Sequence, residues 1–556
     1  MQGGIVEKRI PEPSRVIVIG GGPVGLVTAL LLADAGVATT VVERALAPGD
    51  LPRAISLQDE SFRVFEQLGI ADALKSESLL DTGSRYFGLN GRLLAEAKPS
   101  PSRLGHPAKT QFDQPILEQL LFDRAVEHPG VTLLLGTEAT AITHDVNGVT
   151  VHVTERGVTR QLSAEWLVGA DGGRSFTRSA LGIRLDGSTQ TQRWIVVDLL
   201  NERAQHEPFA EFHCDGKRPY VLVPGVNGRL RIEFMLFDHE DPDEMTTPTN
   251  IRNLLVPAFR NKLLPGDVRR AAVYVAHQRV AHNYRSGRAF LVGDAAHLMP
   301  PFAGQGLNAG VRDAANLAWK LIEAIKGGAS ERLLDSYEIE RRAHGAKMVK
   351  ISRRVGAVVM ATNPLATQTR DAVVRLVNLV PSARRYLANM RFITPPDYSA
   401  GVAVLPGDGP KFAGVQIGRA LSQPTVTDVD GNRAGLDTYL GRGWALIGVG
   451  INPEKASAYW NGIDATRIHL LPPGVAPQKS AAGAEVIDLA ETAAALTGAT
   501  GGEPVFIAVR PDRYVAAVFA ASDEQRVVEE LRNFIDDRAR EARSPQLDSS
   551  ERRDVA

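Results

Sequence analysis

A short glycine-rich turn near the N-terminus constrains the fold of this chain more than any other feature. The apolar segment 16–19 leads into the hexapeptide GGGPVG (20–25), and an apolar stretch (24–35) follows it. The next apolar run, 39–43, ends on an acid. This order predicts a strand, a turn, a helix and a second strand, which together form the βαβ unit of a doubly wound α/β domain.

Each glycine of this turn has a separate physical role. Gly20 allows the tight turn, Gly22 lets a pyrophosphate approach the backbone, and Gly25 lets the helix and strand pack closely. The helix N-terminus faces the phosphate charge, and Glu43 can accept hydrogen bonds from ribose hydroxyls. The alternative is a glycine-rich turn without a ligand. The expected dinucleotide contacts are Gly20, Gly22, Pro23, Gly25, Glu43 and Arg44.

The bulk composition narrows the class of partner. The chain has 556 residues, of which 44% are hydrophobic, and 63 basic residues stand against 64 acidic ones. Its length predicts roughly three or four domains. Its near-zero net charge favours a small-molecule partner over nucleic acid or an anionic membrane. Because glycines interrupt the apolar stretch 16–42, we expect no membrane span, and the polar N-terminus predicts no secretory signal.

The chain contains one cysteine, Cys214, which cannot form an intrachain disulfide. We therefore expect a reducing, cytoplasmic location. No cluster with metal-ligand spacing stands out in the sequence, so we expect no metal site. The difficult chemistry would then fall to an organic cofactor.

The middle of the chain changes from an α/β pattern to a strand-rich one. Between residues 194 and 237, short segments are separated by turn signals such as Asp215-Gly216, which predicts a mostly antiparallel domain inserted into the first. Period-two segments at 131–135 and 149–154 predict a small antiparallel layer. A buried strand (289–292) and a long helix (307–324) then resume the first fold.

A second chemistry-bearing segment is RAFLVGDAAHLMPPFAGQGLN, residues 288–308. It predicts a strand that ends at Gly293-Asp294, a proline-bearing loop and a glycine-rich helix start. Its GD motif resembles, residue for residue, that of the para-hydroxybenzoate hydroxylase group of flavoprotein monooxygenases. The resemblance implies that Asp294 holds the ribityl chain of FAD. A helix beginning near Gly306 would also aim its positive dipole end at the flavin N1–C2=O, where negative charge sits in the reduced cofactor.

Further matches to this group lie on either side of that segment. Asp171-Gly172 follows a buried strand and resembles the DG motif, which in the group touches both FAD and the nicotinamide; alone, Asp-Gly is a turn dipeptide. Arg53 and Gln114 match FAD-contacting positions; without the family, they would be a surface cation and a helix cap. The resemblance implies FAD contacts at Arg53, Gln114, Asp171, Gly172, Asp294, Pro301, Gly304, Gly306, Leu307 and Asn308.

Four segments extend the resemblance over nearly the whole chain. They are RWIVVDL (193–199), RPYV (218–221), RIEFM (231–235) and MRFxxxP (390–396), and they are similar to the 3-(3-hydroxyphenyl)propionate hydroxylase branch of the group. Phenol hydroxylases of the group carry a thioredoxin-like C-terminal domain, which the segment after residue 401 fits. That segment contains no Cys, so a structural or homodimer-related role remains.

The expected fold is therefore α/β, in three parts. They are a Rossmann-like FAD-binding domain of the para-hydroxybenzoate hydroxylase type, an inserted mostly antiparallel β substrate domain and a C-terminal thioredoxin-like α/β domain. The expected boundaries are 14–183 and 269–400 for the FAD-binding domain with its connecting helices, 184–268 for the substrate domain, 401–540 for the C-terminal domain and 541–556 for a disordered tail.

The resemblance implies a single-component monooxygenase. NADH or NADPH, with NADH favoured, would reduce FAD, and dioxygen would add at flavin C4a to give the hydroperoxide that hydroxylates a phenolic ring. The alternatives are a larger polycyclic or polyketide phenol as substrate, and a flavin dehydrogenase or reductase that inserts no oxygen. A further alternative is a non-catalytic, flavin-bound scaffold or sensor.

The sequence offers fewer signals on the substrate side. An alternating segment places Arg231 and Met235 on one face as candidate substrate contacts, although a charged face is also typical of a solvated sheet. Tyr220 could hydrogen-bond to a phenol or help deprotonate it, or it could simply pack. His213 and His297 could titrate near neutral pH. The candidate catalytic residues are Pro301, Tyr220 and His213.

Overall fold

The computed structural model describes residues 14–200, 206–258, 267–391, 393–407, 415–471, 485–488 and 504–539. The expected tail at 541–556 lies outside these ranges. The chain divides into two compact units: Met1–Ala315 with Arg341–Pro395, and Asn316–Glu340 with Pro396–Ala556. The second unit therefore takes in a helical segment, 316–340, that we had expected in the FAD-binding domain. No helix in the described part of the chain is long and apolar enough to cross a membrane.

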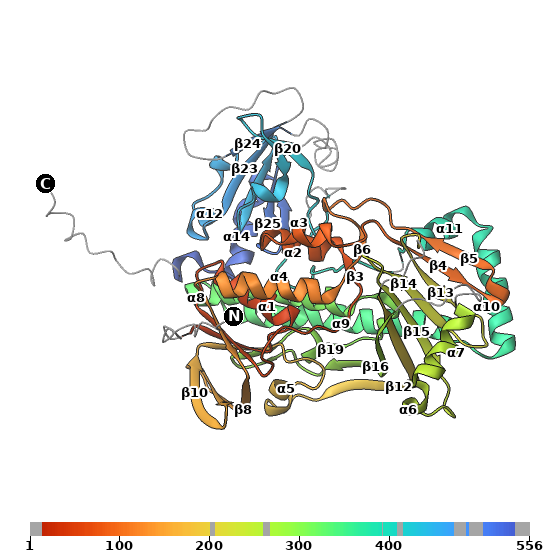
Figure 1. Cartoon of the computed structure of the whole chain (residues 1–556). Helices are drawn as coiled ribbons and strands as arrows, with labels where there is room; N and C mark the ends of the chain where they lie inside the picture. The colour runs from red at the N-terminus through yellow and green to blue at the C-terminus, as the bar shows by residue number, and fades with distance from the viewer. Residues whose placement is uncertain are drawn as a thin grey trace, which may run out of the picture. The chain divides into compact units, whose positions relative to one another are not determined.

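A six-stranded sheet forms the base of the first unit, in the order β17-β18-β11-β1-β2-β7. Its strands and first helix are β1 (Val16–Ile19), α1 (Pro23–Ala33), β2 (Thr39–Glu43), β7 (Val131–Leu135), β11 (Trp166–Gly169), β17 (Arg285–Ser286) and β18 (Ala289–Leu291). The helix that connects β1 to β2 is labelled α1 in Figure 1. The βαβ unit is confirmed, because β1 pairs in parallel with both β2 and β11. The central strands β1 and β11 are buried on both faces, as expected for parallel strands between helices.

One strand assignment within this unit was wrong. Residues 131–135 form β7, which pairs in parallel with β2 instead of joining an antiparallel layer. The antiparallel layer exists without it, as the three-stranded sheet of β8 (Thr137–His144), β9 (Val149–Glu155) and β10 (Val158–Ala164). Alternation of apolar residues could not distinguish the two sheets, because β7 lies at the edge of its sheet and is only partly buried.

The first unit contains further strands and helices before α8. They are β3 (Ser56–Gln58), α2 (Asp59–Gln67), α3 (Ala71–Ser76), β6 (Lys109–Gln111), α4 (Gln114–Glu127), α5 (Phe176–Ala180), η2 (Gly293–Ala295) and η3 (Pro301–Ala303). The helices that follow η3 are α8 (Gly306–Lys326), α9 (Glu331–Val359), α10 (Pro364–Asn378) and α11 (Pro381–Ala388). The loops at 53–58 and 300–305 lie next to each other, since Asn308 hydrogen-bonds to Ser56, Gln58 and Gly304.

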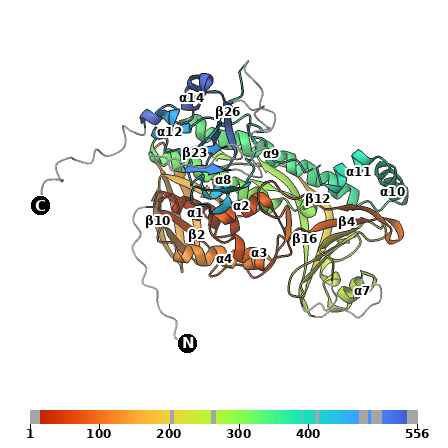
Figure 2. The same cartoon turned by 90° about the horizontal axis from the view of Figure 1, so that it is seen from above.

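An eight-stranded sheet, in the order β19-β16-β12-β15-β14-β13-β4-β5, contains the strands that we expected in the substrate domain, and we call it the substrate sheet (Figure 2). Its strands are β4 (Gly83–Phe87), β5 (Leu93–Ala97), β12 (Leu185–Leu199), β13 (Phe209–His213), β14 (Tyr220–Pro224), β15 (Leu230–Leu236), β16 (Val268–Ala281) and β19 (His297–Leu298). The expected limits 184–268 are too narrow, because β4, β5, β16 and β19 come from outside them. Such pairing between distant segments leaves no local sequence signal.

The two faces of this sheet have different partners. Ile195, Ile232 and Phe234 on one face pack against α7 (Pro248–Ala258), which follows the short helix α6 (Pro242–Met245). Trp194 and Met235 on the other face pack in one cluster with Phe302, which directly follows Pro301. The second face is therefore the one turned toward the GD segment.

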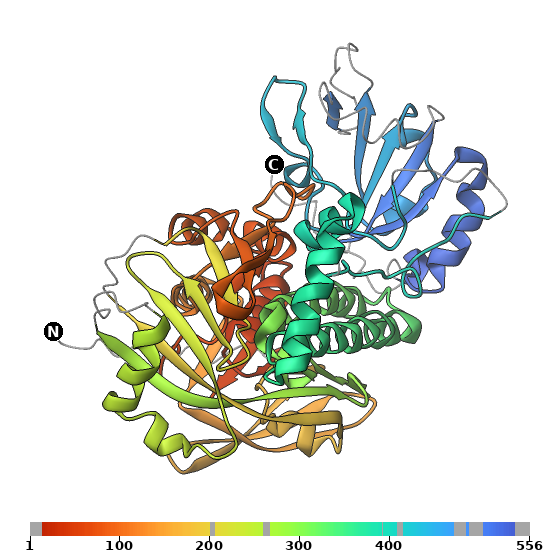
Figure 3. The same ribbon diagram turned by 90° about the vertical axis from the view of Figure 1, so that its right-hand side faces the viewer.

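The second unit contains a seven-stranded sheet, in the order β21-β20-β24-β23-β22-β25-β26 (strands and helix in blue, Figure 3). Its elements include β20 (Thr425–Thr427), β21 (Arg433–Gly435), β22 (Ala445–Val449), α12 (Tyr459–Gly462), β23 (Thr466–Leu471), β24 (Glu485–Asp488), β25 (Val505–Val509), β26 (Val515–Phe519) and α14 (Glu524–Arg532). Beneath it lies a buried ionic cluster in which Glu340 binds Arg510 at 2.7 Å and Lys320 at 2.9 Å. The separate α/β domain that the sequence predicts is present.

Candidate active site

The glycine turn between β1 and α1 has the geometry that its spacing predicts. Gly20 has φ of 109°, and a Cβ there would collide with the carbonyl of Ala170. A Cβ at Gly25 would collide with the carbonyl of Gly20. At Gly22 a Cβ would meet no atom within 4 Å, so the backbone there is open to a close approach. Two glycines are thus needed for the fold, and the third leaves room in front of the α1 N-terminus.

Glu43 takes part in building this turn. Its Oε2 accepts the N–H of Gly21 at 2.6 Å, and its Oε1 accepts the N–H of Ala45 at 2.7 Å. A carboxylate oxygen can accept more than one hydrogen bond, so ribose hydroxyls could still bind there. Arg44 is exposed beside it. Pro23 occupies the first turn of α1, where a missing N–H costs nothing.

A buried cluster of charged and polar side chains fixes the backbone of the GD segment. Asp313 of α8 accepts the N–H of Gly293 at 2.9 Å and hydrogen-bonds to His297 Nε2 at 2.6 Å. Its other oxygen accepts from Arg341 Nε at 2.7 Å, and all three side chains are fully buried. Gly293 has φ of 59°, which favours glycine. His297, which we considered as a titrating group, is therefore a structural partner of Asp313.

Asp294 follows this anchored glycine. Its side chain is exposed. Partial desolvation by the surrounding protein raises the pKa of its carboxyl, and the charges of His297 and Arg53 oppose that shift. Within the described part of the chain, neither the Asp294 carboxylate nor the Arg53 guanidinium hydrogen-bonds to the protein. Both side chains are exposed, so the carboxylate can accept and the guanidinium can donate hydrogen bonds to polar groups of a bound cofactor.

Gln114 acts on Arg53 through the backbone. Its Oε1 accepts the N–H groups of Arg53 and Ala54, at 3.2 and 2.6 Å, and its Nε2 donates to Glu118 at 2.6 Å. Gln114 is the first residue of α4 and is buried. Its side chain therefore positions the Arg53 loop, rather than capping its own helix as in the alternative interpretation.

Asp171 likewise builds the site from behind. Its carboxylate accepts hydrogen bonds from the N–H of Thr177 at 2.8 Å and from the hydroxyls of Ser175 and Thr177. These bonds hold the N-terminus of α5, where Ser175 is the N-cap. The following Gly172 has φ of 77° and no atom within 4 Å of a Cβ position. The open backbone at Gly172, more than the Asp171 side chain, is what a cofactor could approach.

The loop before α8 is fixed by Asn308. Its Oδ1 accepts from the N–H of Gln58 and the hydroxyl of Ser61, and its Nδ2 donates to the carbonyls of Ser56 and Gly304. This side chain has no capacity left for a cofactor. The N–H groups at Gly306, Leu307 and Asn308 belong to the first turn of a long helix and have no partner within it. Any contact that Asn308 makes with FAD would thus come from its backbone.

The substrate face of the sheet is apolar around Phe302. Trp194 and Phe302 meet edge to face with their ring centroids 5.4 Å apart, and Trp194 lies opposite Met235 in the sheet. Phe212, Cys214 and Val223 also belong to this buried cluster. Met235 thus remains a candidate substrate contact. Trp194 and Phe302 were missed, although Phe302 follows Pro301 directly and Trp194 lies in an alternating strand.

The structure corrects the prediction for Tyr220 and His213. Tyr220 pairs with Phe234 in the sheet and packs with the cluster under α7, on the face opposite Met235. His213 stacks on Tyr220 with a centroid distance of 4.2 Å and hydrogen-bonds to Glu211 at 2.9 Å. Their strand register puts both rings on the face turned away from Pro301. We therefore withdraw the catalytic roles and treat the rings as a packing ladder.

Arg231 is neither on a solvated surface nor free. Its guanidinium binds Asp198 at 2.7 and 3.1 Å and donates to the carbonyls of Pro52 and Arg53. Only 6% of the residue is exposed. It therefore ties the substrate sheet to the Arg53 loop. Nearby, Tyr274 donates to Glu233 at 2.7 Å, and burial raises the pKa of Glu233.

Taken together, the fold and the site define a class. They combine three parts of a dinucleotide-binding flavoprotein. These are a parallel sheet with an open glycine turn, an anchored GD loop before a helix N-terminus, and an apolar sheet face beside that loop. The model for the FAD binding domain family matches residues 14–352, and that for the HcaD C-terminal domain matches residues 418–534.

The particular family follows from the relatives. The chain is 37% identical to a 3-(3-hydroxy-phenyl)propionate/3-hydroxycinnamic acid hydroxylase from Mycolicibacterium smegmatis, over 83% of this chain and 82% of the relative. A protein of the same name from Burkholderia cenocepacia is 36% identical, over 90% and 93%. An anhydrotetracycline hydroxylase from Streptomyces rimosus superposes with a TM-score of 0.71 at 27% identity, over 93% of this chain and 98% of that structure. The chain belongs to the FAD-dependent aromatic hydroxylases, which confirms the resemblance.

Proposed function

We propose that this enzyme hydroxylates a phenol that carries a short carboxylate side chain, such as 3-hydroxyphenylpropionate or 3-hydroxycinnamate. NAD(P)H, with NADH favoured, is the reductant. The observation that supports this most is the apolar face of Trp194, Met235 and Phe302 beside the Pro301 loop. These side chains are buried in one apolar cluster, so a ring that binds against this cluster would be shielded from water. The names of the two relatives given above support the choice of substrate.

Bound FAD would supply the redox chemistry, taking a hydride from the nicotinamide and passing oxygen from dioxygen to the ring. The chain's own residues would bind the cofactor and orient it. Asp294 and Arg53 offer polar groups without described protein partners, and Gln114 and Asp313 hold their loops. The N-terminus of α8 presents N–H groups and a positive dipole end, which stabilise negative charge.

The C-terminal unit takes no part in this chemistry in our proposal. Its core has the parallel strands β24, β23 and β22 followed by the antiparallel β25 and β26, an arrangement that supports a thioredoxin-like fold. Because it contains no Cys, we assign it a structural or homodimer-related role. A cytoplasmic location belongs to the same proposal and rests on the single cysteine of the chain.

The test is substrate-stimulated oxidation of NADH by the purified flavoprotein, with the hydroxylated product identified. Phenylpropionates, benzoates and larger polycyclic phenols should be compared. A dihydroxyphenyl product from a phenylpropionate would support the proposal. Flavin reduction without any oxygenated product would instead support a reductase, and bound flavin that neither nicotinamide reduces would support a non-catalytic scaffold.

A further inference from the structure

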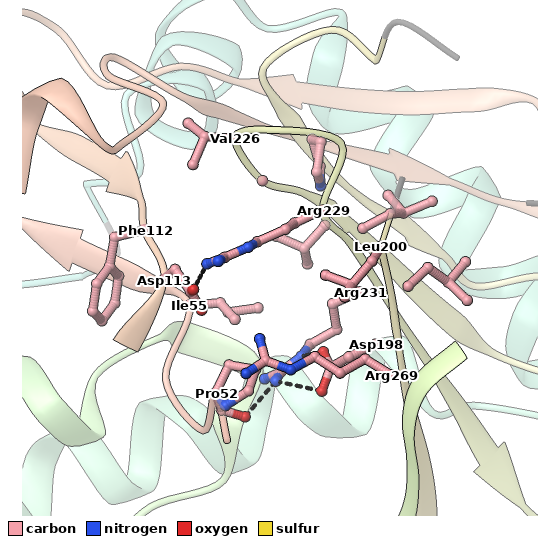
Figure 4. Close-up of a pocket in the computed structure, with 15 residues that line it drawn as sticks. Pro52, Ile55, Phe112, Asp113, Asp198, Leu200, Val226, Arg229, Arg231 and Arg269 are labelled. Atoms are coloured by element: carbon pink, nitrogen blue, oxygen red, sulfur yellow. Dashed lines mark hydrogen bonds and ion pairs between the residues drawn. The ribbon is translucent and has the colours of Figure 1, made fainter. Parts of the chain in front are cut away.

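An arginine-lined pocket lies at one end of the substrate sheet (Figure 4). The ends of β12, β14 and β15 form one wall, and the loop at Pro52 and Ile55 forms the opposite wall. The charged groups that line it are Arg229, Arg231, Arg269, Asp113 and Asp198. Three guanidiniums against two carboxylates give this lining a formal excess of one positive charge.

The two carboxylates are already committed to two of the arginines. Arg231 binds Asp198 through two hydrogen bonds, and Arg229 forms an ion pair with Asp113. Figure 4 shows Arg229 reaching across the pocket to Asp113, while Arg231 turns toward Asp198 and Pro52. Arg269 is the cation in the lining that these carboxylates do not neutralise.

Most N–H groups of the Arg269 guanidinium have no hydrogen-bond partner among the described residues. Among these residues, the carbonyl of Asp50 accepts a hydrogen bond from one terminal nitrogen of Arg269 at 2.6 Å. A guanidinium has five N–H donors in a planar fork that matches a carboxylate. Burial lowers the pKa of Arg229, and the nearby positive charge of Arg269 lowers it further. An anion between the two arginines would relieve that repulsion.

The pocket also adjoins the apolar face on which the ring would lie. Ile55 lines the pocket and packs against the cluster that contains Trp194 and Phe302. Val223 lines the pocket and belongs to that cluster as well. A ligand with an apolar ring and a carboxylate on a short chain could therefore place its ring against the apolar cluster and its carboxylate in the pocket, with Ile55 between them.

We propose that this pocket is the carboxylate subsite of the substrate, with Arg269 as the main ligand and Arg229 as the second. The proposal rests on the proposed function, and it adds the residues that select an acid over a neutral phenol. The phosphates of a nicotinamide dinucleotide share the anionic chemistry. The substrate is favoured because Val223 belongs to both the pocket lining and the apolar cluster, and Ile55 lines the pocket and packs against that cluster.

The test uses the FAD-loaded full chain and the variant Arg269→Gln. Binding of 3-(3-hydroxyphenyl)propionate and of its neutral alcohol, 3-(3-hydroxyphenyl)propanol, is followed by the change in flavin absorbance without turnover. We expect Arg269→Gln to weaken binding of the acid by about tenfold or more, as for a lost charged hydrogen bond, and to leave the alcohol unchanged. Arg269→Lys should lie between the two, because it keeps the charge and loses the fork.

Arg252→Gln is the matched control, since Arg252 is an exposed arginine of α7 away from the pocket lining. Equal loss of acid and alcohol in Arg269→Gln, or no loss of either, would overturn the subsite. A higher KM for NADH with unchanged binding of the acid would assign the pocket to the dinucleotide instead, and would also overturn it. A wild-type protein that neither binds nor hydroxylates phenylpropionates would refute the proposed function itself.

Discussion

Asp313 and His297 form a fully buried pair in which Asp313 Oδ2 lies 2.6 Å from His297 Nε2 and also accepts the N–H of Gly293. The pair fixes the backbone immediately before Asp294. Arg341 balances the charge of Asp313 from the other side. The position of the GD loop thus depends on Asp313 of α8, a fully buried residue.

Asp313→Asn should therefore damage both the fold and the cofactor site. It leaves Arg341 buried without its counter-charge, and breaking such a pair costs about 3–5 kcal/mol. The measurement is thermal unfolding together with FAD affinity in reconstituted apoprotein. Both should fall. Asp335→Asn, an exposed acid of α9, is the control; unchanged FAD affinity in Asp313→Asn would contradict the anchoring role.

Asp294→Ala should weaken FAD binding while the protein remains folded. Its carboxylate has no protein partner in the described part of the chain, so its removal leaves no buried donor unsatisfied. Loss of a hydrogen bond to a charged group should lower FAD affinity by roughly 10- to 100-fold. Fluorescence titration of apoprotein with FAD measures this, with Asp243→Ala on the exposed helix α6 as the control. Wild-type affinity would remove Asp294 from the site.

Met235→Ala should uncouple reduction from hydroxylation. Truncating a side chain packed between Trp194 and the Phe302 cluster opens a cavity on the apolar face, at a cost of about 2–5 kcal/mol in stability. Water would gain access to that face. The ratio of hydroxylated product to NADH consumed should fall, and hydrogen peroxide should rise. Met235→Leu, which keeps the volume, should stay close to wild type; equal uncoupling by both would argue against packing as the cause.

Tyr220→Phe and His213→Asn should change kcat less than about twofold, because both rings lie on the face turned toward α7. Any effect should be on stability, through the stack. Steady-state kinetics with a phenylpropionate are sufficient for this test. A loss of kcat by two orders of magnitude with normal folding would restore the catalytic roles expected from the sequence.

The pH dependence of stability in the second unit should depend on Glu340. Although burial opposes it, the charges of Arg510 and Lys320 lower the pKa of Glu340 to about 2. A carboxyl with a lowered folded-state pKa stabilises the protein above its unfolded value near 4.5, and that contribution is lost as pH falls toward 2. The shift corresponds to about 3 kcal/mol. Hydrogen exchange of β25 should show this acid sensitivity in wild type and far less of it in Glu340→Gln, which should already be destabilised at neutral pH. An unchanged acid response in that variant would contradict the assignment.

Much of the cofactor domain could be predicted because its signals are local. The turn at 20–25 and the loop at 293–308 each lie between a strand and a helix in sequence, so spacing alone locates them. The contacts that hold these loops could not be predicted in the same way. Gln114 reaches Ala54, and Arg231 reaches Pro52, across long stretches of chain.

The substrate side was harder for a related reason. Alternation divides a strand into two faces, but it does not say which face meets the GD loop. Tyr220 and Met235 were both reasonable candidates, and only the packing of Phe302 against Trp194 separates them. Arg231 could not be recognised as buried, because its partner Asp198 lies on a neighbouring strand distant in sequence.

The central claim is that this chain inserts an oxygen atom from dioxygen into a phenolic acid. The most direct measurement is the mass of the product formed from 3-(3-hydroxyphenyl)propionate and NADH under isotopically labelled dioxygen. We predict one labelled oxygen atom in a new ring hydroxyl. Consumption of NADH that yields hydrogen peroxide and no labelled product, with this acid and with the other phenols, would contradict the account.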